Sequence, residues 1–195
     1  MAPSRRSTSA PPDRSPAADP APRSPLRLYL DQNYLSGIAK RKPDFRELEP
    51  VLRAAIARGV VTVLESAVHE RESRPRPDLG LLELLRDLSG GRRLPDPPPR
   101  LWREVRRRME WVLEHELPQR RRRPGDAADL EALAGALPGC DLVTCDAFMA
   151  DVIHRARLDL RFDCELFTGR RPDVRALTKR LRDLGCGYAA RMSTA

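Results

Sequence analysis

The chain has 195 residues and a net charge of +8, with 36 Lys and Arg against 28 Asp and Glu. This length suits one domain with a sizeable core. There is no apolar run of about 18 residues, and the first residues lack the apolar centre of a secretory signal, so we expect a cytoplasmic protein without a membrane span. The four cysteines are spaced unlike a zinc site or a disulfide framework, which favours reduced thiols.

The positive charge is concentrated in two segments. Residues 1–25 hold four Arg against two Asp, and residues 92–124 hold eleven Arg against five acids, so the two segments account for the whole excess. Residues 1–25 are rich in Pro, Ser and Arg with almost nothing to bury, and we expect a disordered tail. The basic segment at 92–124 indicates either a polyanion partner or a solvated helix face.

The first predicted element is a short buried strand at residues 26–30, which ends at Asp31 and is followed by a helix start at 32–36. Residues 45–58 carry apolar side chains at helical spacing, so we expect a helix there. The apolar run at 60–64 predicts a second strand.

Helices are expected next at 65–73 and at 79–88. The proline-rich stretch 94–100 predicts a rigid linker that is not helical. Residues 101–117 alternate apolar positions at three-to-four spacing with arginines, which is typical of an amphipathic helix with a basic outer side. A basic loop follows at 119–125.

The remaining pattern predicts a helix at 125–137, a third strand within 140–146, a helix at 147–154, a short strand at 164–167 and a last helix at 173–184. Strands that are continuous apolar runs and alternate with helices favour a parallel sheet covered on both faces. The predicted fold class is therefore α/β.

Two aspartates, Asp31 and Asp146, come directly after predicted strands. Parallel strands end at one edge of a sheet, and ligands bind in the crevice there. Asp126 and Asp129 are three residues apart and share one face of the first turn of the helix before the third strand. Because converging carboxylates without a neutralising cation repel one another, the sequence predicts a divalent cation at this edge.

Each acid also has a structural alternative. Asp126 follows Pro and Gly at a helix start, so N-capping is its expected role. Asp146 could cap the helix after it, and Asp129 could favour the helix dipole. Glu70 and Glu72 lie on the helix after the second strand. Taken singly, Glu65, Glu70, Asp141 and Asp151 are expected to be solvated surface charges.

Three segments, in this order, resemble the motifs of PIN and PIN-like domains, a family of metal-dependent nucleases. "LRLYLDQNYLS" resembles the first motif, an apolar strand that ends in Asp with Asn two residues on. "ESAVHERES" resembles a Ser-x-x-His-x-x-Glu pattern, which falls on Ser66, His69 and Glu72. "GDAADLEALAGALPGCDLVTCDAFMADVI" is similar to the closing motif, in which an acid opens a helix and a strand with Thr precedes a final Asp.

The resemblance spans residues 26–155 and implies a PIN-like three-layer α/β/α sandwich over 26–195. It makes residues 92–124 an Arg-rich helical insertion. It also implies a metal-dependent endoribonuclease that uses Mg²⁺ or Mn²⁺. The implied metal-binding acids are Asp31, Glu72, Asp129 and Asp146. Asn33 and Thr144 match supporting polar positions, Glu65 or Glu70 could replace Glu72, and Asp126 competes with Asp129.

RNA is the expected partner, single-stranded by resemblance alone, and a low aromatic content of 5% gives no apparent base-stacking platform. The arginines expected to hold its backbone are Arg103, Arg106, Arg107, Arg108, Arg120, Arg121, Arg122 and Arg123. A homodimer and an antitoxin-like protein inhibitor are further partners that the sequence neither selects nor excludes. The main alternative function is a catalytically inactive PIN-like module that binds nucleic acid, and a small-molecule phosphotransferase ranks last because no Gly-rich phosphate loop is present.

Overall fold

The computed structural model describes residues 24–73, 77–121 and 123–192, with only the backbone described beyond residue 186. Its centre is a sheet of four parallel strands in the order β2-β1-β3-β4. The strands are β1 (Leu26–Tyr29), β2 (Val61–Val63), β3 (Leu142–Cys145) and β4 (Glu165–Thr168). The predicted α/β class with a parallel sheet is confirmed. The expected tail, residues 1–25, lies almost wholly outside the described residues.

The strand order reverses in the middle of the sheet. The chain passes from β1 to β2 on one side, and from β3 to β4 on the other. Leu28 lies opposite Leu142 and Tyr29 opposite Val143, so β1 and β3 are direct neighbours. Ligands of open α/β sheets bind beyond the carboxyl ends of the strands at such a reversal. The end of β1 and the end of β3 therefore mark the place to look for a site.

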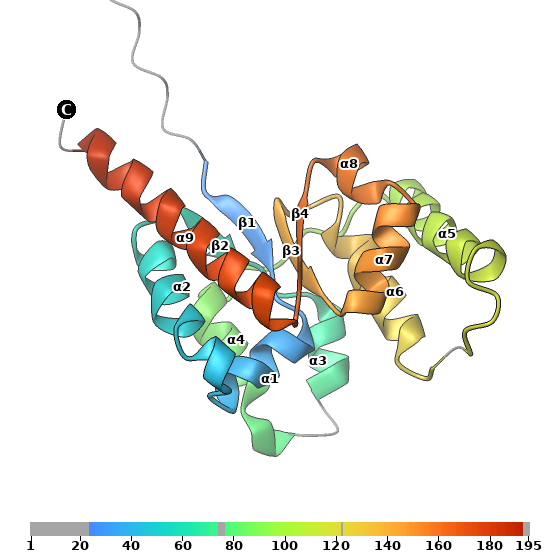
Figure 1. Ribbon diagram of the computed structural model, residues 1–195, viewed down its shortest axis with the longest axis horizontal. Helices are drawn as coiled ribbons and strands as arrows, with labels where there is room; N and C mark the ends of the chain where they lie inside the picture. Colours follow the sequence, from blue (N-terminus) through green and yellow to red (C-terminus); the bar gives the residue numbers. More distant parts are fainter. Residues whose placement is uncertain (1–23, 74–76, 122, 193–195) are drawn as a thin grey trace, which may run out of the picture.

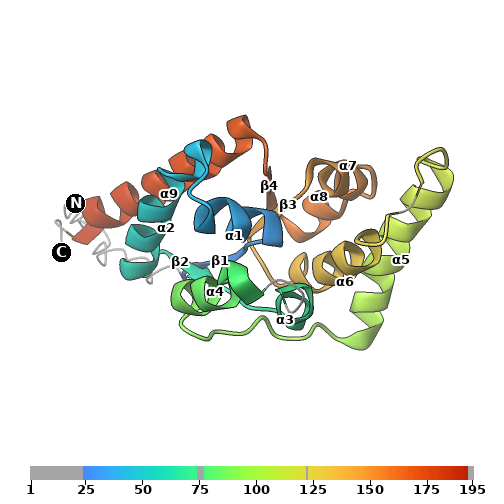
Figure 2. The ribbon, with the colours of Figure 1, turned by 90° about the horizontal axis from the view of Figure 1, so that it is seen from below.

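Helices cover both faces of the sheet, as Figures 1 and 2 show. Because side chains of a strand alternate, Leu28 and Leu30 enter one core while Tyr29 enters the other. The first core includes α1 (Gln32–Ala39), α2 (Leu48–Ala57), α4 (Leu81–Ser89) and α9 (Arg171–Met192). The second includes α5 (Pro99–His115), α6 (Asp126–Ala136) and α7 (Ala147–Arg155). These layers fit a three-layer α/β/α sandwich.

Several element boundaries differ from the predictions. The prediction that residues 94–100 are not helical was wrong for the last two residues, because α5 begins at Pro99. Proline is accepted at the first helical position, where no backbone N–H is needed. The helix expected at 45–58 starts later, since Pro43–Phe45 forms a separate 3₁₀ turn. A short helix, α8 (Leu158–Phe162), was not predicted.

The short helix α3 (Ala67–Ser73) follows β2 and contacts α1, α4 and α6. Buried His69 anchors it: its Nδ1 accepts from the Ser66 backbone N–H (3.0 Å), so its Nε2–H donates to the Leu30 carbonyl (2.7 Å). Burial lowers the pKa of His69, which keeps the ring neutral for both bonds. His69 thereby fixes α3 to the end of β1.

Among the helices that the structure describes, none combines the length and the apolar character that crossing a membrane requires.

Candidate active site

A pocket of about 240 Å³ lies at the reversal of strand order, where β1 and β3 end. The carboxylates of Asp31, Glu72, Asp129 and Asp146 all line it. These four residues, which we name the acidic pocket, come from four separate parts of the chain. The predicted acids are thus brought to one place by the fold, and Asn33 and Thr144 lie there with them.

Asp31 both caps a helix and faces the acidic pocket. Its Oδ1 accepts from the Tyr34 backbone N–H (3.0 Å), which caps α1, and from the Thr144 hydroxyl (3.2 Å). Its Oδ2 accepts from Asn33 Nδ2 (3.2 Å). Thr144 also accepts from the Asp31 backbone N–H (2.7 Å), so β3 holds Asp31 at two points. The strand therefore ends in an aspartate that is fixed in position by both neighbouring elements.

Asp146 follows β3 and begins α7, much as Asp31 follows β1 and begins α1. Its Oδ1 accepts from the Met149 backbone N–H (2.6 Å) and caps α7, as the capping alternative predicted. Capping engages only one carboxylate oxygen. Because Asp146 also lines the acidic pocket, capping and a site role coexist in this residue.

Glu72 is the one of the three candidate glutamates that lines the acidic pocket. The Glu70 carboxylate, two residues earlier on α3, instead pairs with Arg93. Glu65 accepts from the Ser89 hydroxyl and forms a parallel bridge with Arg93. The turn of α3 beyond its His69 anchor therefore directs Glu72 toward the pocket and Glu70 away from it.

Asp126 is engaged elsewhere, and its predicted role as N-cap was wrong. The cap position of α6 is Gly125, without a side-chain bond. The buried Asp126 carboxylate turns back to the Arg120 guanidinium (2.5 and 3.1 Å) and to the Arg123 backbone N–H (2.8 Å). Arg120 also lies over the Phe148 ring, 3.3 Å from its centroid. Arg120 thus neutralises Asp126 and closes the loop before α6, while Asp129 is left facing the pocket.

Burial, and after it the charges of neighbouring acids, raise the pKa values of Asp31, Glu72 and Asp129. Burial, and then the charges of the other three acids, raise the pKa of Asp129 from 3.8 to about 7. Burial raises the pKa of Asp31, against its hydrogen bonds. Burial and the Asp31 charge raise the pKa of Glu72, although the Arg71 charge lowers it. No cation is among the causes of the shift at Asp129, so the negative charge around this residue is uncompensated.

The donor set suits a hard divalent cation. Carboxylate oxygens are the ligands that Mg²⁺ and Mn²⁺ prefer. Among the described residues, none donates a hydrogen bond to the carboxylate of Glu72 or of Asp129. Within the same part of the chain, however, no three His, Cys, Asp or Glu side chains are arranged to hold one ion as they stand. A bound ion would therefore require some of the four carboxylates to move closer together.

Some of the predicted nucleic-acid arginines form an ion pair, and others have no ion-pair partner among the residues that the structure describes. Arg106 pairs with Glu110 (2.9 Å), and Arg120 with Asp126. Arg108 donates to the Ala156 carbonyl (3.4 Å), whereas Arg107 is exposed on the outer side of α5. Arg103, Arg121 and Arg123 are exposed as well, and Arg122 lies outside the described residues.

Sequence reasoning missed two supporting residues of the site. Arg120 was counted among the nucleic-acid arginines, although the Pro-Gly turn between it and Asp126 was a signal that the chain could fold the two together. Gln32 lines the acidic pocket and donates from Nε2 to the Glu72 carbonyl (3.0 Å), which ties α1 to α3. No pattern in the sequence indicated that contact.

No protein-family model matches the chain, and neither a curated protein nor a solved structure is significantly similar to it. The resemblance to PIN domains therefore stays a hypothesis that rests on three short motifs. What bears on function is the geometry of the acidic pocket itself.

Proposed function

We propose that this protein is a metal-dependent nuclease of the PIN-like kind, which hydrolyses phosphodiester bonds of RNA at the acidic pocket. One observation carries the proposal: four carboxylates from separate elements line a single pocket where the strand order reverses. Such an arrangement costs electrostatic energy in the free protein, and a bound cation offsets that cost. RNA as substrate rests on the motif resemblance.

Asp31, Glu72, Asp129 and Asp146 would hold Mg²⁺ or Mn²⁺. Such an ion supplies a water activated for attack and stabilises the leaving oxygen of a phosphodiester. Asn33 and Thr144 orient Asp31 through their hydrogen bonds. Because ligand-orienting partners fix the donor atoms, they raise metal affinity without touching the ion.

The surroundings of the pocket favour an anionic substrate. Helices α1 and α7 start directly after Asp31 and Asp146, so the positive ends of two helix dipoles point toward the pocket. A phosphodiester would therefore approach a positively polarised rim around a metal-binding centre.

The test is cleavage of a single-stranded RNA by the wild type, by Glu72→Gln and by Glu70→Gln. Glu70 is the matched control, because it lies on the same helix but pairs with Arg93 outside the pocket. We expect EDTA to abolish cleavage and Mg²⁺ or Mn²⁺ to restore it. Loss of a residue that only orients a metal ligand costs about 10- to 100-fold. Glu72 would be a ligand itself, so Glu72→Gln should lower kcat/KM by about 100-fold or more.

Two results would contradict the proposal. Cleavage that persists in EDTA would show that the reaction needs no divalent cation. Equal activity of Glu72→Gln and Glu70→Gln would remove the acidic pocket from it. RNA binding without metal-dependent cleavage by any of the three proteins would instead favour the catalytically inactive binding module.

A further inference from the structure

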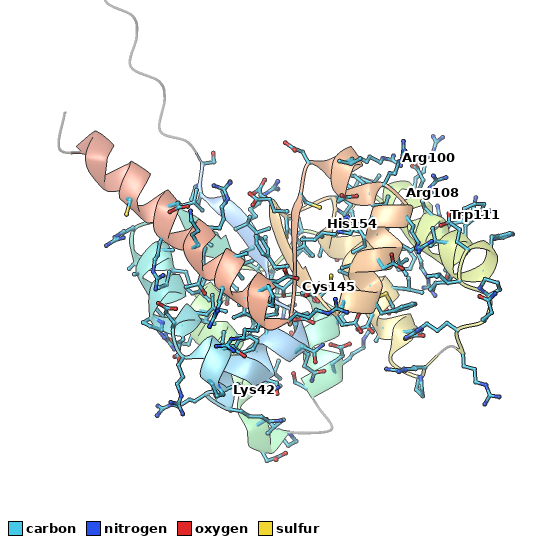
Figure 3. The ribbon with its side chains drawn as sticks, viewed as in Figure 1. Lys42, Arg100, Arg108, Trp111, Cys145 and His154 are labelled. Carbon is cyan, nitrogen blue, oxygen red and sulfur yellow. The ribbon has the colours of Figure 1, made fainter. Side chains whose placement is uncertain are left out.

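A second group of cations, none of them among the predicted nucleic-acid arginines, lies where α1 ends and α9 begins. Figure 3 shows Lys42 beside α1, well apart from Arg108 and Trp111 of α5. Arg46 Nε donates to the Arg41 carbonyl (3.4 Å), which holds the residues after α1 together. The exposed cations of this group, which we name the basic patch, are Lys40, Arg41, Lys42, Arg46 and Arg170.

The fold places the basic patch next to the acidic pocket. Thr168, the last residue of β4, lies opposite Cys145 of the pocket, so Arg170 follows at the same edge of the sheet. The Tyr34 hydroxyl, from the first turn of α1, donates to the Thr168 carbonyl (2.6 Å). Helix α1 begins at the pocket, and its eight residues span about 12 Å. At ~3.4 Å per nucleotide, a strand covers this distance in about four nucleotides.

The acids around the basic patch are already engaged. Asp44 pairs with Arg171 (2.9 Å), which also joins the turn after α1 to the start of α9. Glu47 pairs with Arg182, and Asp173 accepts two hydrogen bonds from the end of β4. Within the ranges that the structure describes, none of the five cations of the basic patch forms an ion pair. The patch therefore carries positive charge without a counter-ion from the protein.

The backbone at Arg41 argues against a purely structural role for these cations. Arg41 follows the C-cap of α1 with a φ of 48°, in the left-handed region. Glycine is favoured at this position, because a side chain there brings its β-carbon close to the following carbonyl oxygen. The helix dipole favours cations at the end of α1, but this effect does not extend to Arg46 or Arg170, which lie outside that helix. Neither capping nor the dipole explains the whole patch.

We propose that the basic patch binds the phosphate backbone of the RNA on one side of the scissile bond, so that the strand runs from the acidic pocket along α1. This inference rests on the proposed function and deepens it by giving the face of the molecule over which the substrate leaves the pocket. Lysine and arginine side chains that contact phosphates displace counterions from the strand, and such contacts carry no base information. The basic patch therefore sets the affinity and the path of the strand but not its sequence.

The test is the affinity of a labelled 12-nucleotide single-stranded RNA, measured by fluorescence anisotropy in EDTA at several salt concentrations. The main variants are Arg41→Gly and Arg170→Gln. Arg157→Gly is the matched control, because Arg157 is an exposed arginine with a φ of 54° that follows the end of α7 remote from the pocket. Neither glycine variant should lower the melting temperature. Arg41→Gly and Arg170→Gln should each weaken binding about fivefold at about 0.1 M salt, because one lost phosphate contact lowers the salt slope of a single strand by about 0.7, whereas Arg157→Gly should leave it unchanged.

Equal affinity of Arg41→Gly, Arg170→Gln and the wild type would overturn the inference. An equal loss with Arg157→Gly would also overturn it, because binding would then follow net charge and not this patch. A polyglutamate peptide that bound as tightly as RNA, with the same dependence on Arg41, would assign the patch to an acidic protein instead. Since binding is measured in EDTA, a protein that binds RNA through the patch but never cleaves it would contradict the proposed function alone. Cleavage with unchanged binding by both variants would contradict the basic patch alone.

Discussion

Replacing Asp129 with Asn should stabilise the metal-free protein near neutral pH. Folding raises the pKa of the Asp129 carboxyl from 3.8 to about 7. At about 1.4 kcal/mol per pKa unit, full ionisation of this carboxyl would lower the free energy of unfolding of the protein by about 4 kcal/mol. Asp129 is half-buried, so solvent screens part of this cost, and we expect a gain of about 1–2 kcal/mol for Asp129→Asn.

The direction of the Asp129 pKa shift determines the pH range over which the stability of the protein should change. Between pH 4 and 7, the folded protein binds a proton at Asp129 that the unfolded chain releases, so this residue makes stability fall as pH rises through that range. The wild type should show this fall, and Asp129→Asn should show a smaller one. The assay is urea unfolding in EDTA at several pH values from 4.5 to 8. If both proteins had the same pH dependence, the claim that charge accumulates around Asp129 would be wrong.

Three further outcomes follow from the contacts. Asp31→Asn should keep the α1 cap, so in EDTA it should melt near the wild-type temperature. It should lose the stabilisation by Mn²⁺, which amounts to about 2.7 kcal/mol for the wild type at a Mn²⁺ concentration of 100 times Kd. A much lower melting temperature in EDTA would show that Asp31 acts only as a cap. Arg120→Ala should lower the free energy of unfolding in urea by about 2–3 kcal/mol, because it leaves Asp126 buried without its partner. The double variant Arg120→Ala/Asp126→Ala should recover part of this loss, and additive losses would show that the pair is uncoupled. Arg107→Gln should reduce the slope of log K for RNA binding against log salt concentration by about one, and Arg106→Gln should reduce it by less, because Arg106 already pairs with Glu110. Equal slopes for the two variants would indicate that Arg107 is only a solvated surface charge.

The convergence of acids could be predicted because it depends on local patterns. An apolar run that stops at Asp31 or Asp146 marks the carboxyl end of a strand, and all such ends share one edge of a parallel sheet. The strand order could not be predicted, because it depends on long-range pairing. That order places β1 beside β3, and it is what brings these two aspartates next to each other.

The details that escaped prediction are set by tertiary contacts. The motif resemblance favoured Glu72 but left Glu65 and Glu70 open, and the anchoring of His69 on the Leu30 carbonyl places Glu72 at the pocket. Trp111 does not share the spacing of the buried residues of α5, and this position off the core stripe was the one signal in the sequence that its ring is exposed. What it borders depends on α8, whose five residues carry no helical periodicity.

The central claim is that the acidic pocket binds a divalent cation, and anomalous diffraction from crystals containing Mn²⁺ tests it most directly. We predict an anomalous peak bordered by carboxylate oxygens of Asp31, Glu72, Asp129 and Asp146, with the last turn of α3 and the first turn of α6 drawn toward the ion. The same crystals of Asp129→Asn should show a weaker peak or none. A folded wild-type protein without a peak in this pocket, or with its strongest manganese peak at another site, would contradict the account.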